Sequence, residues 1–203
     1  MDCIVRKLKA SVNNANLPVF ENVVIKNYIT TTQNGQYIDL SDIFSNTKKV
    51  KMEVKYIKTS TSNFFTVLYG GVSYILHNKG YTRVYNPNEG TLVSTPADSE
   101  IHAGCDASDG SWFVGETTGS VTPPTSDYSG VFYVFARPLH LDESVAGEVR
   151  IKWIKLTTYA TSSSDTPVEY ILVPATVNGV ACLFDQNRGT TYFEKNNGAL
   201  VCG

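Results

Sequence analysis

The last third of the chain constrains its fold most, because short apolar runs alternate there with tight-turn dipeptides. The runs cover residues 170–174, 180–185 and 191–193, and the dipeptides are Asn178-Gly179, Arg188-Gly189 and Asn197-Gly198. Asn and Gly tolerate the positive φ that a short hairpin turn requires. The pattern therefore predicts consecutive antiparallel hairpins. The stretch holds no cluster of catalytic or metal-binding residues, which favours a scaffold.

Strand alternation extends over most of the remaining chain. Val50, Met52, Val54 and Tyr56 alternate with polar residues, which places these four on one face of a strand. Similar runs occupy residues 64–69, 81–85, 131–136 and 149–156, whereas residues 117–129 and 157–166 are predicted to be long loops. Many short strands without helical periodicity predict an all-β antiparallel sandwich or barrel. We expect a single such domain over residues 27–203.

The charge balance argues against a nucleic-acid partner. The chain of 203 residues has 17 basic and 19 acidic side chains and a net charge of -2. Phosphate binding needs clustered Lys or Arg, and the short basic runs 6–9 and 48–51 are typical of a solvated surface. Because no apolar run has the length of a signal peptide core or a membrane span, the expectation is a protein that is neither secreted by that route nor inserted in a membrane.

Metal and cofactor sites are not expected. Cysteines stand at positions 3, 105, 182 and 202, without the spacing of a zinc site, and are predicted to be free thiols or small core residues. His77, His102 and His140 each lie near a turn signal and are predicted to be surface or loop residues. The run 106–110 resembles part of a calcium loop but lacks its later acidic residue, so a plain turn is favoured.

Residues 1–26 differ from the rest of the chain. Asn13, Asn14, Asn16 and Pro18 interrupt any regular element between two short apolar pieces. The pattern is compatible with a helical stripe or with an extended arm that docks on another molecule. We expect an arm that contacts other proteins or other copies of the chain.

Sugar binding usually pairs an aromatic ring with a nearby carboxylate or amide. The best candidates in the sequence are Trp112 beside Asp109, and Tyr85 beside Asn86. Trp112 also fits a buried strand residue, and Tyr85 also fits the end of a strand. Trp153 alternates with Ile151, which predicts a core position.

Several motifs in order resemble the concanavalin A-like lectin/glucanase domain of bacteriophage tail and head fibre proteins and of gut-bacterial surface proteins. They are the segments Gly35-Gln36-Tyr37-Ile38-Asp39, 133–137, 150–155, 179–185 and Tyr192-Phe193. Cys182 and Phe184 stand where this family usually has Gly and Tyr. Residues 1–20 are similar to the leaders of virion structural proteins of gut Bacteroidales phages. The resemblance implies a two-sheet jelly-roll sandwich with an extended N-terminal arm.

The resemblance also implies a function. Glucanases of this class carry a Glu-X-Asp-X-X-Glu strand, which is absent here, and neither Glu53 nor Glu148 has an acidic partner at that spacing. The expectation is thus a non-enzymatic virion protein, made in the host cytoplasm, whose lectin-like domain binds host-surface or mucus glycan. It would attach to other virion proteins through residues 1–26 and form a homo-oligomer, a trimer in such fibres. A purely structural virion protein that binds no sugar, and a bacterial surface carbohydrate-binding module, are the alternatives.

Overall fold

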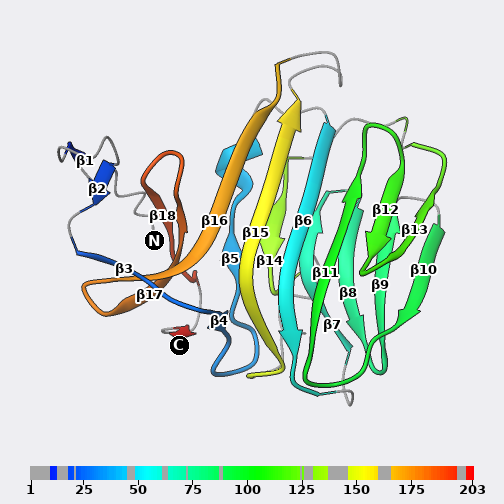
Figure 1. Cartoon of the computed structure of the whole chain (residues 1–203), viewed down its shortest axis with the longest axis horizontal. Helices are drawn as coiled ribbons and strands as arrows, with labels where there is room; N and C mark the ends of the chain where they lie inside the picture. The colour runs from blue at the N-terminus through cyan, green and yellow to red at the C-terminus, as the bar shows by residue number, and fades with distance from the viewer. Residues whose placement is uncertain are drawn as a thin grey trace.

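The fold is built almost entirely of antiparallel strands (Figure 1). The computed structural model describes residues 10–12, 18–20, 22–44, 49–60, 64–71, 73–86, 89–123, 125, 130–136, 146–159, 166–195 and 200–203. These residues contain no α-helix, and one 3-10 helix, η1, spans Ser41–Phe44. None of their helices is long and apolar enough to span a membrane.

Two sheets make up most of the fold, and the smaller one has six strands among the described residues. In spatial order they are β10 (Glu89–Ser94), β9 (Tyr81–Asn86), β8 (Ser73–Asn78), β7 (Phe64–Gly70), β14 (Phe132–Val134) and β5 (Ile38–Asp39). We call it the small sheet.

The other sheet, the large sheet, has eleven described strands. Eight run side by side: β13 (Thr117–Ser120), β12 (Ser111–Val114), β11 (Ser99–Asp106), β6 (Lys49–Lys58), β15 (Val149–Tyr159), β16 (Val168–Val177), β17 (Val180–Asp185) and β18 (Thr190–Tyr192). The remaining three are β3 (Val23–Ile25), which pairs with β16, and β4 (Ile29–Thr30), which pairs with β15 and with β19 (Val201–Cys202).

The alternation that predicts β6 is seen in its burial. Val50, Met52, Val54 and Tyr56 are almost fully buried, while the residues between them are half-buried. Side chains of this kind from both sheets form one continuous apolar core. The two sheets therefore face each other as a β-sandwich, which confirms the predicted all-β antiparallel class.

The C-terminal hairpins form as predicted where the structure describes them. β16 and β17 pair through the turn at Asn178 and Gly179, whose φ angles are 52° and 81°. β17 and β18 pair around Gly189, where φ is 67°. The third turn signal, Asn197-Gly198, lies outside the described residues.

The segment predicted as an arm contains three short strands. β1 (Ala10–Val12) and β2 (Pro18–Phe20) pair with each other in a two-stranded sheet of their own. β3, at residues 23–25, instead joins the large sheet through β16. The predicted boundary after residue 26 thus follows a strand that already belongs to the large sheet.

Two predicted loops are partly strands. Thr117–Ser120 forms β13, the edge strand beside β12, because Val114 and Thr117 close a hairpin around Gly115. Residues 157–159 continue β15 along β6. Residues 126–129 and 160–165 of the predicted loops lie outside the described residues.

A buried polar chain joins the sheets at one end of the core. The Tyr56 hydroxyl lies 2.7 Å from Thr82 Oγ1, which lies 3.1 Å from Thr95 Oγ1. The ammonium of Lys58, which is 0% exposed, donates to Thr95 Oγ1 at 3.0 Å, to the Thr95 carbonyl, and to the Lys79 carbonyl at 3.1 Å. All three of its protons therefore have acceptors.

This lysine predicts a pH-dependent stability. Burial lowers the pKa of Lys58 below its ordinary 10.5. Between the two values the unfolded chain binds more protons than the folded chain, so the Lys58 contribution to stability rises with pH up to about 10.5. In urea unfolding from pH 7 to 10.5, the stability of the native protein relative to Lys58→Met should increase. If the difference in unfolding free energy between the native protein and Lys58→Met stays constant over this pH range, the lowered pKa of Lys58 is contradicted.

Candidate functional site

The outer face of the large sheet carries the residues that alternate with the core positions of β6. Lys51, Glu53 and Lys55 lie on this face and are half-buried. The register of β11 sets Asp106, Gly104 and His102 beside them in that order. Polar side chains from neighbouring strands therefore come together on the outer face of the large sheet.

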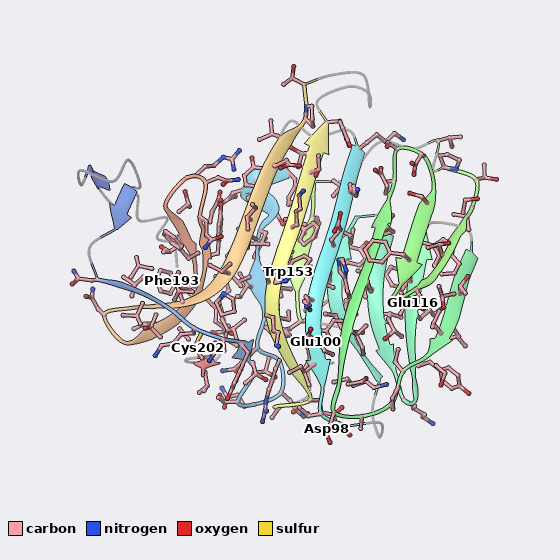
Figure 2. All side chains as sticks on the ribbon, viewed as in Figure 1. Asp98, Glu100, Glu116, Trp153, Phe193 and Cys202 are labelled. Atoms are coloured by element: carbon pink, nitrogen blue, oxygen red, sulfur yellow. The ribbon has the colours of Figure 1, made fainter. Side chains whose placement is uncertain are left out.

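A β-bulge in β15 adds a tryptophan to this face. Ile151 pairs with Tyr56, but Trp153 pairs with Lys55, so the register shifts by one residue between them. Such a bulge turns the following side chain to the opposite face. Trp153 is half-buried rather than buried, and the prediction that it belongs to the core is wrong. Figure 2 shows Trp153 over the middle of the large sheet.

Three rings form a row across the outer face. The ring of Phe113 lies over Gly104, where an added Cβ would come within 2.6 Å of it. The His102 ring meets Phe113 edge-on at a centroid distance of 4.7 Å and meets Trp153 edge-on at 5.1 Å. His102 lies inside β11 with its side chain partly exposed, so the prediction of a surface residue is confirmed and the loop alternative is wrong. We call Phe113, His102 and Trp153 the aromatic row.

Ion pairs border the row on one side. Glu100 accepts from Lys55 at 2.6 Å and also from Lys152. Hydrogen bonds from Lys152 and Lys55 lower the pKa of Glu100. These charges are solvent-exposed, so each pair contributes little to stability but keeps polar groups next to the rings.

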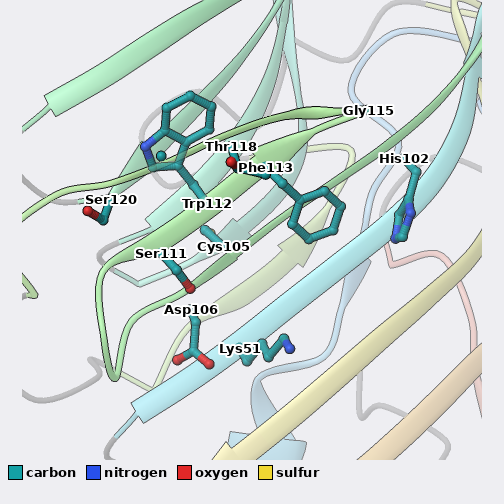
Figure 3. A pocket seen from close by; sticks show the side chains of 11 residues that line it. Lys51, His102, Cys105, Asp106, Ser111, Trp112, Phe113, Gly115, Thr118 and Ser120 are labelled. Atoms are coloured by element: carbon teal, nitrogen blue, oxygen red, sulfur yellow. The ribbon is translucent and has the colours of Figure 1, made fainter.

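A shallow cavity of about 570 Å³ adjoins the row on its other side. It collects residues of β6, β11, β12 and β13 (Figure 3). They are Lys51, His102, Cys105, Asp106, Ser111, Trp112, Phe113, Gly115, Thr118, Gly119 and Ser120. The set offers three rings, one carboxylate, one ammonium and several hydroxyls.

Two acidic residues approach this cavity from neighbouring strands. Glu53 pairs with Lys51 at 3.3 Å and with His102 Nε2 at 3.3 Å. Asp106 Oδ1 accepts from the Ser108 amide at 2.8 Å and from its hydroxyl at 2.6 Å. These two hydrogen bonds from Ser108 to Asp106 form the turn that was predicted for residues 106–110.

Trp112 and Asp109 lie on one hairpin but do not form a joint site. The Trp112 indole packs against the core and lies over Gly119, and it points away from Asp106 and Lys51 (Figure 3). Asp109 is exposed, and its Oδ1 accepts from the Ser111 amide at 2.8 Å. Trp112 lines the cavity, but Phe113 supplies the ring beside His102.

Tyr85 and Asn86 belong to the other sheet. Both lie on β9, where Tyr85 pairs with Tyr74 and Asn86 pairs with Glu89. Their side chains lie outside the description. The four predicted binding residues are thus divided between two sheets.

The described cysteines and acidic groups form no metal site. Cys105, Cys182 and Cys202 are free thiols, and burial raises the pKa of the first two to about 12. Such thiols behave as small apolar residues rather than nucleophiles. Among the described residues no three His, Cys, Asp or Glu side chains gather to hold a metal ion. Cys3, His140 and the side chain of His77 lie outside the description.

Comparison with known proteins assigns the chain to no family. No family model and no curated protein matches the chain. Among solved structures, the chain is similar to the binding domain of Botulinum neurotoxin DC in complex with rat synaptotagmin II. The TM-score is 0.32 and the identity 7%, over 87% of this chain and 72% of that chain. At this level the likeness indicates neither a common family nor a common ligand.

Proposed function

We propose that this chain is a non-enzymatic glycan-binding protein whose binding site is the aromatic row with the adjoining cavity. The bulge in β15 is the observation that carries the proposal. Without it, Trp153 would point into the core, and the His102 ring would lose one of its two aromatic neighbours. A large indole turned toward solvent beside His102 has no evident role in packing.

The chemistry of the site matches a sugar ring. A pyranose has an apolar face that stacks on an aromatic ring and hydroxyls that need hydrogen-bond partners. Phe113 and Trp153 supply rings, while Asp106, Ser111 and Lys51 supply acceptors and donors at the cavity. A volume of about 570 Å³ falls within the usual range for ligand pockets.

The carboxylates at the site are proposed to bind rather than cleave. Glycoside hydrolysis requires a carboxylic acid and a carboxylate on opposite sides of the scissile bond. Glu53 is held by Lys51 and His102, and Asp106 by Ser108. These contacts favour fixed acceptors for sugar hydroxyls. An assay for reducing ends released from polysaccharides should detect no cleavage.

The sequence resemblance extends the proposal to a virion subunit with a concanavalin A-like jelly roll. Under this proposal the N-terminal segment attaches the subunit to another virion protein, and homotrimers present several weak sites at once. Linked sites bind more tightly than single ones without any new contact. The separate β1–β2 hairpin supports an N-terminal segment that reaches beyond the sandwich.

Removing the tryptophan tests the site. On a glycan array, Trp153→Ala should lower the affinity for any bound glycan about fivefold or more, because a stacking ring contributes on the order of 1 kcal/mol or more. Val201→Ala is the matched control, since it truncates an apolar side chain that is 46% exposed at the far end of the large sheet. Equal binding by both variants would contradict this site, and no binding by the native protein would favour a purely structural role.

A further inference from the structure

Tyrosines recur at matching positions on three adjacent strands of the small sheet. The register pairs Tyr74 with Tyr69, and Tyr69 with Tyr133. Neighbouring strands lie about 4.8 Å apart, so the row offers one tyrosine position at each such step. We call these three residues the tyrosine row.

The row lies on the outer face of the sandwich. Leu68, Ile75 and Val134, which adjoin the row in sequence, are 0% exposed in the core. Side chains alternate along a strand, so Tyr69, Tyr74 and Tyr133 belong to the opposite face. All three are half-buried. The large sheet, with the aromatic row, lies on the other side of the core.

Ring contacts hold the tyrosines of the row in two pairs. The rings of Tyr69 and Tyr74 are nearly parallel, with centroids 6.1 Å apart and 16° between their planes. The Tyr133 ring meets Tyr37 edge-on at 5.2 Å. Tyr69 and Tyr74 therefore hold each other in place, and Tyr37 holds Tyr133.

Charged groups stand at the end of the row. Asp39 pairs with Tyr133 across β5 and β14, and its Oδ2 lies 2.7 Å from Lys195 Nζ. Burial and the charge of Asp39 raise the pKa of Tyr133, so its phenol keeps its proton. The end of the row thus offers a hydroxyl, a carboxylate and an ammonium.

We propose that the tyrosine row is a second glycan-binding site, which takes a linear glycan chain laid across β8, β7 and β14. The inference rests on the glycan-binding function proposed above. A linear glycan repeats an apolar ring face and a set of hydroxyls at regular steps, as the row repeats a ring and a phenol. An extended peptide would instead pair its backbone with a sheet edge. The row crosses the middle of the sheet, where β8, β7 and β14 are already paired on both sides.

Two sites on opposite faces let one molecule hold two glycan chains. The test uses soluble dextran, laminarin, xylan and mannan, with binding measured by retardation in polysaccharide-containing gels. The variant Tyr69→Ala/Tyr74→Ala should lose about tenfold or more in affinity for at least one polysaccharide that Trp153→Ala still binds. Tyr69→Phe/Tyr74→Phe keeps the rings and should lose less, which separates lost stacking from misfolding.

The outcomes separate the two sites. If Trp153→Ala loses all binding while both tyrosine variants bind like the native protein, the second site is overturned and the first stands. If no polysaccharide binds to the native protein, both sites are overturned. The second site is also overturned if the tyrosine variants change only the oligomeric state in sedimentation equilibrium, or only the binding of a proline-rich peptide. In those cases the row would be a contact between copies or a peptide site.

Discussion

Replacing Phe132 by alanine should lower the free energy of unfolding by about 3–5 kcal/mol, because truncating a buried phenylalanine leaves a cavity as well as losing apolar burial. Phe132 is 0% exposed on β14, and its ring stacks on Phe44 at 4.8 Å with 10° between the planes. Its backbone also holds η1, since its amide donates to Ser41 Oγ at 3.0 Å and its carbonyl accepts from the Leu40 amide at 2.8 Å. A loss of this size is a large fraction of the stability of an ordinary domain.

Chemical unfolding of four variants, Phe132→Ala, Phe44→Ala, their combination and Leu92→Ala, checks this expectation. Leu92→Ala, which truncates a side chain that is 50% exposed on β10, should change stability by less than about 0.5 kcal/mol. Phe44→Ala combined with Phe132→Ala should cost less than the sum of the single changes, because each ring loses the other as its partner. Additive losses would show that the stacked pair does not act as a unit.

The sequence predicts the strands well because burial imposes a period of two residues. Along β6, each apolar residue from Val50 to Tyr56 lies in the core, as the alternation predicts. The turn at Asn178-Gly179 is equally local, since it depends only on residues that tolerate positive φ. β13 escapes prediction because Thr117, Thr118, Gly119 and Ser120 show no apolar alternation, and the strand exists only by pairing with β12.

The site is harder to predict because it depends on how strands far apart in the sequence are aligned. Phe113, His102 and Trp153 lie on three strands, and no spacing within the chain shows that their rings meet. The sequence of β15 does contain one indication that Trp153 leaves the core. The apolar positions of β15 are 149 and 151 and then 154 and 156, a change of phase that marks the bulge. Simple alternation from Ile151 places Trp153 on the same face, and this predicted the core position that the bulge changes.

Gly110 should be the least replaceable glycine of the cavity hairpin. Its φ is +77°, and a Cβ there would collide with the carbonyl group of Val121. The Gly110 amide donates to the Asp106 carbonyl at 2.9 Å, and its carbonyl accepts from the Val121 amide at 3.0 Å. Backbone strain and steric overlap add, so Gly110→Ala should lower the free energy of unfolding by about 2–5 kcal/mol.

Gly115→Ala separates the two contributions. Gly115 also has a positive φ, +58°, but nothing lies within 4 Å of its added Cβ, so only the strain of about 1–2 kcal/mol should remain. The difference between the two variants in thermal and urea unfolding therefore measures the collision with Val121. Equal losses in the free energy of unfolding would mean that Val121, which follows β13, moves away from the added methyl group without lowering stability. A larger loss at Gly110 would show that the chain around Val121 resists displacement next to Ser111 and Ser120, which line the proposed sugar site.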